Sequence, residues 1–135
     1  RDAVLRDERT ADLRNNDRAH SQRAELGDAF YMLLSACIRA HHAPALHPTI
    51  GTYSFRRQCN EIVRYLTHAA DLAEWIESGA ASDRMHDDLH RNLDHAYSYM
   101  HALCTLGYGW DVGEVVEEAC QKFERKYAAA QEGAQ

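Results

Sequence analysis

Residues 53–77 read YSFRRQCNEIVRYLTHAADLAEWIE, and the pattern of this stretch indicates the fold class. Apolar and small side chains recur along it at alternating steps of four and three residues: Phe55, Cys59, Ile62, Leu66, Ala69, Ala73 and Ile76. This period places all of them on one face of an α-helix. The stretch therefore predicts an amphipathic helix over residues 54–78 with one buried face.

The same period continues towards the C-terminus. Residues 83–106 carry an apolar stripe that begins at Met85, and residues 111–130 carry one that begins at Val112. Ser82 or Asp83 is the expected N-cap of the first of these helices, and Asp111 is the expected N-cap of the second. Two more helices are therefore predicted after residue 78.

The N-terminal part of the chain also favours helix. Residues 25–42 carry a shorter apolar stripe, whereas residues 1–24 are highly polar and predict a helical arm. Residues 43–53 hold both prolines and form the clearest loop. The sequence offers no strand-like alternation of useful length. It predicts one all-α domain, a helical bundle of four to five helices.

Composition and charge argue against several classes of protein. The formal net charge is −6 and no basic stripe is evident, so nucleic-acid binding is not expected. No apolar run approaches the roughly 18 residues of a membrane span, and the chain does not open with a signal-peptide pattern. The four cysteines lie far apart without a CxxC pair, which is typical of reduced thiols in a cytoplasmic protein, although spacing alone leaves two disulfides open.

Carboxylates at helical spacing are the first candidates for chemistry. Glu25 and Asp28 are three residues apart, as are His68 and Asp71, so each pair shares a helix face. Asp94 lies on a polar face of the third helix. Carboxylates from facing helices can enclose Mg²⁺ or Mn²⁺. From spacing alone, a solvated helix surface is the simpler interpretation of each group.

Cations and histidines form two further groups. Lys122, Arg125 and Lys126 lie near the end of the last helix, where they suit either a triphosphate or the helix C-terminus. Three histidines in the loop region suit zinc, or they are simply exposed: His41, His42 and His47.

Several short segments resemble all-α nucleoside triphosphate pyrophosphatases of the MazG type. The segments AADLAEWI (69–76), LDHAYSYM (93–100) and VGEVVEEACQKFERKY (112–127) are similar to the closing helices of that family, and the resemblance spans roughly residues 55–127. The segment ELGD at Glu25 to Asp28 matches the family's ExxD motif in full, but it precedes the others.

The chain also departs from the family's pattern. The ExxE motif falls on His68-x-x-Asp71 and the ExxD motif falls on Arg91-x-x-Asp94, so each loses its first acid. The family's asparagine on the last helix falls on Ala119. The metal site is therefore expected to be altered in at least one of its parts.

The resemblance implies a MazG-like fold and a specific reaction. It implies metal-dependent hydrolysis of a (deoxy)nucleoside triphosphate to a monophosphate and pyrophosphate, with Mg²⁺ or Mn²⁺ as cofactor. The implied catalytic residues are four acids: Glu25, Asp28, Asp71 and Asp94. The implied metal ligands are these acids together with His68. The residues implied to balance phosphate charge are Lys122, Arg91 and Lys126. The resemblance further implies a homodimer or homotetramer with the nucleotide near a subunit interface.

The altered motifs favour a second hypothesis. Because a cation within a carboxylate cage repels a metal ion, the chain is also interpreted as a non-catalytic helical module of the same fold that binds a partner or serves a structural role. A third hypothesis is a different helical protein. Two patterns, Arg14-Asn15 followed by His20 and Arg91-Asn92 followed by His95, are faintly similar to HEPN-type ribonucleases, and residues 92–100 are faintly similar to a flagellar export chaperone.

Overall fold

The computed structural model describes residues 2–48, 54–79 and 82–133, with side chains from His20 onward. Its helices are α1 (Asp2–Arg39), α2 (Phe55–Glu77), α3 (Asp83–Ala102), the π-helical segment η1 (Leu103–Gly107) and α4 (Val112–Gly133). The described ranges contain no strand, so the all-α prediction is confirmed. Residues 49–53 of the predicted loop lie outside the described residues.

Side-chain caps fix where three of the helices begin. Ser54, Ser82 and Asp111 each accept a hydrogen bond from the backbone N–H three residues further on, at 3.3, 3.3 and 3.0 Å. These bonds satisfy N–H groups that have no partner within the first helical turn. The caps predicted for the helices after residue 78 are therefore confirmed.

The first helix differs from its predicted outline. The sequence divides residues 1–42 into a polar arm and a separate helix, whereas α1 runs without interruption from residue 2 to residue 39. Nothing in this stretch breaks a helix, because the change at residue 25 is one of polarity and not of backbone preference. Polarity alone therefore does not mark a helix boundary here.

The C-terminal end of α1 is closed by backbone hydrogen bonds. His42 N–H donates to Cys37 O at 2.9 Å, and His41 N–H donates to Ile38 O at 3.1 Å. His41 adopts a φ of +53°, in the left-handed region that glycine usually occupies at this position. This arrangement turns the chain sharply, so that the following residues run back along α3.

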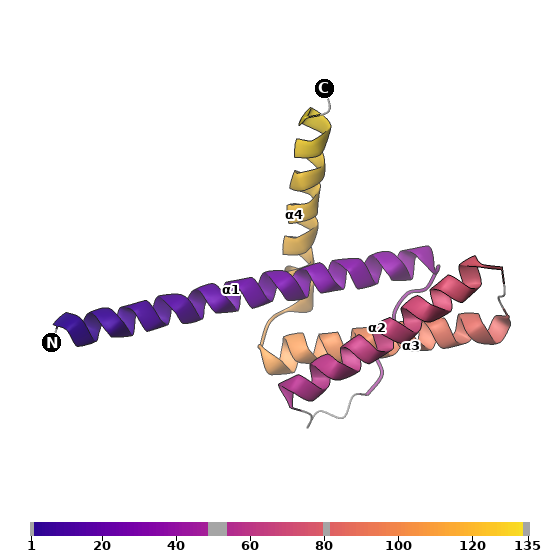
Figure 1. The fold of residues 1–135 in the computed structure, drawn as a ribbon, viewed down its shortest axis with the longest axis horizontal. Coiled ribbons are helices and arrows are strands. Elements are labelled where there is room, and N and C mark those ends of the chain that lie inside the picture. The colour runs from indigo at the N-terminus through magenta and orange to yellow at the C-terminus, as the bar shows by residue number, and fades with distance from the viewer. Residues whose placement is uncertain (1, 49–53, 80–81, 134–135) are drawn as a thin grey trace.

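The helices pack as a pair with two projecting arms (Figure 1). α2 and α3 run antiparallel and lie side by side, and the C-terminal half of α1 lies against α3. α4 crosses the C-terminal half of α1, near Gly27, and extends away from the α2–α3 pair, while the N-terminal half of α1 extends in another direction. The two described ends of the chain are therefore far apart.

The core lies where α1, α2 and α3 meet. It is formed by ten buried side chains, which come from every helix: Phe30, Leu33, Cys37, Ala69, Leu89, Leu93, Ala96, Met100, Cys104 and Val115. All four cysteines are free thiols, and burial raises the pKa of Cys37, Cys59 and Cys104. No helix in the described part of the chain is long and apolar enough to cross a membrane.

Gly27 allows α1 and α4 to approach each other closely. A Cβ atom at this position would lie 3.1 Å from the carbonyl oxygen of Val115 and 3.3 Å from the Cβ of Ala119. Val115 is 1% exposed and Ala119 is 5% exposed, so the two helix surfaces are in direct contact. One turn further along, the rings of Tyr31 and Phe123 stack with their centroids 4.3 Å apart.

Candidate functional site

A pocket of about 600 Å³ lies beside this crossing of α1 and α4. α1 contributes five of its lining residues, which are His20, Arg23, Ala24, Gly27 and Asp28. α4 and the turn before it contribute Trp110, Val115, Glu118, Ala119 and Lys122. The pocket thus combines charged side chains, an aromatic ring and the small residues of the helix contact.

One ion pair in the pocket joins Arg23 to Glu118. The Arg23 Nε and Nη2 atoms donate to the two Glu118 carboxylate oxygens at 2.8 Å each, and Nη2 also lies 3.7 Å from Glu114. These bonds raise the pKa of the Arg23 guanidinium and lower the pKa of the Glu118 carboxyl. Because the contact is bidentate, it fixes the orientation of the guanidinium plane.

A second ion pair joins Asp28 to Lys122. The Lys122 ammonium donates to Asp28 Oδ1, and both side chains are partly exposed, at 41% for Asp28 and 29% for Lys122. The two residues are 94 positions apart in the sequence. The structure therefore places an acid of the ExxD segment against a lysine of the last helix, two residues that the sequence had named separately.

Trp110 forms an aromatic wall of the pocket. The Arg23 guanidinium carbon lies 5.4 Å from the centre of the Trp110 ring, within the range of a cation–π interaction. Tyr108 stacks on Trp110 with ring centroids 4.2 Å apart and planes 4° from parallel. The guanidinium is therefore positioned by both Glu118 and Trp110.

The other residues named from the sequence lie outside this pocket. Glu25 is exposed and lines a smaller, mostly apolar groove of about 330 Å³ between α1 and α2. His68 and Asp71 are exposed on α2. Arg91 pairs with its neighbour Asp88 on α3 at 3.5 Å. None of these four residues lines the pocket with Asp28.

Lys126 also lies beyond the lining of the pocket. It is exposed on α4, one turn after Lys122, with its ammonium nitrogen 5.7 Å from the centre of the Phe123 ring. Of the three cations implied to balance phosphate charge, Lys122 is thus the one that lines the pocket.

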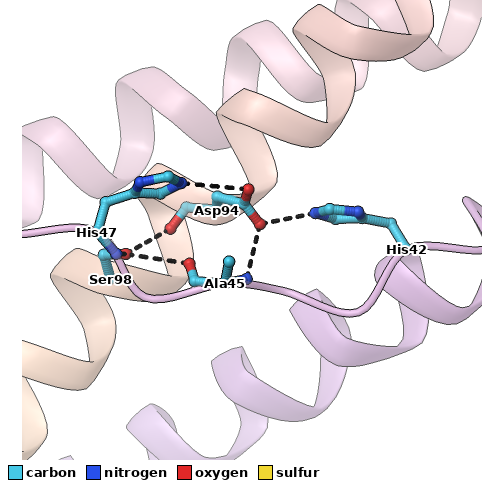
Figure 2. A network of polar contacts seen from close by, with 5 residues as sticks. All are labelled: His42, Ala45, His47, Asp94 and Ser98. Atoms are coloured by element: carbon cyan, nitrogen blue, oxygen red, sulfur yellow. Dashed lines mark hydrogen bonds and ion pairs between the residues drawn. The ribbon is translucent and has the colours of Figure 1, made fainter.

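Asp94 has a different role, because it anchors the segment that follows α1 (Figure 2). Asp94 Oδ1 accepts hydrogen bonds from His42 Nε2 at 2.7 Å and from the Ala45 N–H at 2.9 Å, and Oδ2 accepts one from His47 Nε2 at 3.3 Å. The His47 N–H donates to Ser98 Oγ at 2.9 Å, and Ser98 Oγ donates to the Asp94 carbonyl at 2.8 Å. We refer to these five residues as the Asp94 anchor.

The charge state of the anchor follows from its contacts. Burial raises the pKa of Asp94, but the hydrogen bonds from Ala45, His42 and His47 outweigh it, so the pKa lies below its ordinary value. An ionised carboxylate can only accept hydrogen bonds, so the Nε2 atoms of His42 and His47 both carry a proton. Nearby, burial and then the charge of His47 lower the pKa of His95. The anchor fastens the segment after α1 to α3.

The fit of a divalent metal ion depends on which carboxylates can meet. Among the described residues, no group of three or more histidine, cysteine, aspartate or glutamate side chains is placed to hold a metal ion. Mg²⁺, however, is often held by one or two carboxylates, with water and substrate phosphates completing its coordination. Asp28 and Glu118 supply two carboxylates to one pocket, where each is paired with a cation.

Three charged or aromatic side chains of the pocket were not site candidates in the sequence: Arg23, Trp110 and Glu118. Gly27 provides the one local signal, because a glycine inside a helix can mark the close approach of another backbone. The stripe positions Val115 and Ala119 then indicate which face of α4 meets it. Glu118 and Lys122 flank that face one turn apart, and Arg23 lies one turn before Gly27.

Comparison with known proteins assigns no family to the chain. No family model, no curated protein and no solved structure matches it. The interpretation of the pocket therefore depends on its own residues and on the resemblance of the short segments.

Proposed function

We propose that the protein hydrolyses a (deoxy)nucleoside triphosphate to a monophosphate and pyrophosphate in the α1–α4 pocket, with Mg²⁺ or Mn²⁺ as cofactor. The observation that carries the proposal is the contact between Asp28 and Lys122. The MazG resemblance assigns an acid to the ExxD helix and a phosphate-binding lysine to the last helix. Contact between these two residues, 94 positions apart, is what a shared substrate site requires.

The pocket has the size and charge for such a substrate. Its volume of about 600 Å³ lies within the range of about 300–1,000 Å³ typical of small-molecule sites. Lys122 and Arg23 would bind phosphate oxygens, Lys122 as a point charge and Arg23 as a bidentate fork. Asp28 and Glu118 would hold the metal ion, which when bound polarises the phosphate and lowers the pKa of a water nucleophile.

A homodimer or homotetramer belongs to the same proposal. The resemblance implies a nucleotide site near a subunit interface, and the pocket lies at the base of the two projecting arms (Figure 1). A second copy packed against these arms would enclose the pocket and exclude water from it, which strengthens its electrostatic interactions.

The test is a pyrophosphate-release assay across a panel of ribo- and deoxynucleoside triphosphates with Mg²⁺ and with Mn²⁺. Asp28→Asn and Lys122→Met are each expected to lower kcat/KM by at least about 100-fold. Asp71→Asn and Lys126→Met change the same residue types outside the pocket and should leave kcat/KM within about twofold of the wild-type value. Absence of pyrophosphate release from every triphosphate with both metals would exclude the reaction.

The second candidate function is a non-catalytic helical module that binds a partner. The specific observation that favours it is the Asp94 anchor, because this acid of the altered ExxD motif is already bound by three donors from its own chain. In this hypothesis the carboxylates stabilise the fold and the projecting arms bind the partner. A Mn²⁺ titration followed by electron paramagnetic resonance distinguishes the two: saturable binding lost in Asp28→Asn supports the hydrolase, and no binding, with or without nucleotide, supports the module.

A further inference from the structure

The two ion pairs of the α1–α4 pocket have a crossed arrangement of charge. α1 supplies a cation and an anion, Arg23 and Asp28, and α4 supplies an anion and a cation, Glu118 and Lys122. Each pair joins the two helices, and Glu118 and Lys122 are one helical turn apart on α4. The four charges sum to zero, so the pocket is not simply a basic site or an acidic one.

Each of these charges already has a partner. A phosphate that approached Arg23 or Lys122 alone would meet the carboxylate bound there, and a metal ion that approached Asp28 or Glu118 alone would meet a guanidinium or an ammonium group. Either ligand by itself would have to displace one member of each pair and leave that member unpaired. Neither ligand alone is therefore well matched to the pocket.

The pairs are nevertheless open to exchange. The carboxylate side chains are the more exposed members, at 56% for Glu118 and 41% for Asp28, whereas Arg23 is 20% exposed and Lys122 is 29% exposed. Partly exposed ion pairs contribute little to stability, so separating them is not prohibitive. The cations can keep their places at the pocket wall while the carboxylates turn towards another partner.

We propose that this pocket binds a divalent cation and a polyphosphate only in combination, by exchanging both ion pairs at once. Polyphosphate oxygens replace Glu118 on Arg23 and Asp28 on Lys122, and the two released carboxylates bind the divalent cation that accompanies the polyphosphate. Every charge that loses a partner gains a new one. The inference rests on the proposed function, since it concerns the same pocket, and it assigns roles to Arg23 and Glu118, which the resemblance does not.

Coupled binding of this kind is reciprocal. If the cation raises the affinity for the polyphosphate by some factor, the polyphosphate raises the affinity for the cation by the same factor. Couplings of this type usually lie between about fivefold and 150-fold. We therefore expect the complex to bind at least about tenfold more tightly than either component alone.

The probes are MgCl₂, metal-free tripolyphosphate and the preformed Mg²⁺–tripolyphosphate complex, each titrated into the full chain by calorimetry. The complex is expected to bind at least about tenfold more tightly than metal-free tripolyphosphate or Mg²⁺. Equal affinity for tripolyphosphate with and without Mg²⁺ would overturn the inference, and so would the absence of binding by any probe.

A double variant provides the sharper test. Asp28→Asn with Glu118→Gln removes both carboxylates, which leaves Lys122 without its partner and Arg23 with only the more distant Glu114, at 3.7 Å. Metal-free tripolyphosphate should therefore bind at least about tenfold more tightly than to the unaltered protein, and Mg²⁺ should no longer raise its affinity. Asp87→Asn with Glu124→Gln removes the same net charge at exposed positions outside the pocket and should leave every affinity within about twofold. Retained preference for the Mg²⁺ complex in the pocket variant would contradict the exchange.

The binding result and the hydrolysis result can fail independently. Coupled binding of Mg²⁺ and tripolyphosphate without pyrophosphate release from any nucleotide would remove the hydrolase and retain the exchange. Hydrolysis of a nucleotide by a protein that binds metal-free and Mg²⁺-bound tripolyphosphate equally would retain the hydrolase and remove the exchange.

Discussion

The Asp94 carboxylate accepts hydrogen bonds from three donors, and all three belong to the segment after α1. The donors lie 47 to 52 positions away in the sequence. A network over such a separation orders a segment that has no secondary structure of its own. From the sequence, His42 and His47 were candidates for zinc and Asp94 for catalysis. In the structure both histidines are instead hydrogen-bonded to Asp94.

Replacing Asp94 with asparagine should destabilise the fold in a pH-dependent way. At neutral pH we expect Asp94→Asn to lower the free energy of unfolding by about 1–3 kcal/mol, because an amide NH₂ group would face an imidazole N–H. The pKa of Asp94 is lower in the folded state than its ordinary value near 4, so its contribution is complete above about pH 5, declines from about pH 4 and is lost as the pH falls through the folded value.

Urea unfolding of both proteins between about pH 7 and pH 2 measures this effect. The difference in free energy of unfolding between the wild-type protein and Asp94→Asn should be constant above about pH 5 and should shrink below about pH 4. Asp71→Asn serves as the control, since Asp71 is exposed, and it should differ from wild type by less than about 0.5 kcal/mol. A difference that grows on acidification would contradict the assignment.

His41 is a position where one substitution should stabilise the protein. Its φ of +53° strains any residue with a Cβ, and its side chain is exposed. We expect His41→Gly to raise the free energy of unfolding by about 0.5–1 kcal/mol, the strain relief exceeding the added entropy of the unfolded chain. His86→Gly, an exposed position inside α3, should instead lower it by a similar amount. Thermal unfolding measures the stability of both variants. A lower midpoint in His41→Gly than in the wild-type protein would contradict the inference that His41 is strained.

At the scale of the helices, the contact at Gly27 holds the α1–α4 pocket in shape. Gly27→Leu would place a side chain against the Val115 carbonyl and should lower the free energy of unfolding by about 1–3 kcal/mol. It should also weaken binding of the Mg²⁺–tripolyphosphate complex by more than about tenfold, because the helices that carry the two ion pairs would separate. Ala36→Leu adds the same side chain at an exposed position of α1 and should change neither quantity appreciably. Unchanged binding in Gly27→Leu would show that the pocket does not depend on this contact.

The helices themselves were largely predictable from local pattern. The predicted segments 54–78 and 111–130 agree with α2 and α4 to within three residues, because a sustained apolar period and a good N-cap act together. The predicted segment 83–106 corresponds to α3 and most of η1. The π-helical turn itself was not foreseen, since its hydrogen-bond pattern has no counterpart in the apolar period.

The pocket was only partly predictable. Asp28 and Lys122 were named because each belongs to a motif, but their contact depends on how α4 crosses α1, which helical periodicity does not specify. Arg23 and Glu118 belong to no motif and become significant only when they face each other. Glu25 and Asp71 illustrate the converse, since each belongs to an i, i+3 pair that suits a metal site and neither of them lines the pocket.

At the scale of the whole molecule, the shape departs from that of a compact domain. A helix of 38 residues such as α1 is about 57 Å long, whereas a compact chain of this length has a radius of gyration of about 14 Å. Residues 124–133 of α4 are exposed throughout. Helices that extend this far from a core gain little from tertiary packing, and another subunit would supply the missing contacts.

We therefore expect the protein to self-associate in solution. Light scattering after size exclusion should give two or four times the chain mass of 15.4 kDa, and the thermal midpoint should rise with protein concentration, because association stabilises the folded state. Tyr127→Glu, which introduces a charge at a position on α4 that is 68% exposed, should weaken association. A monomer at all concentrations, with a constant midpoint, would contradict this expectation.

The contact at Gly27 also gives α4 an uneven resistance to opening along its length. Val115, Ala119 and the two ion pairs hold its first three turns against α1, whereas its last ten described residues, 124–133, are exposed. Amide hydrogens near Ala119 should exchange with solvent deuterium slowly, and those beyond residue 124 should exchange rapidly. The pocket therefore lies at the end of α4 that should open least often, and a partner that binds the exposed end of α4 would act on the pocket through this one helix.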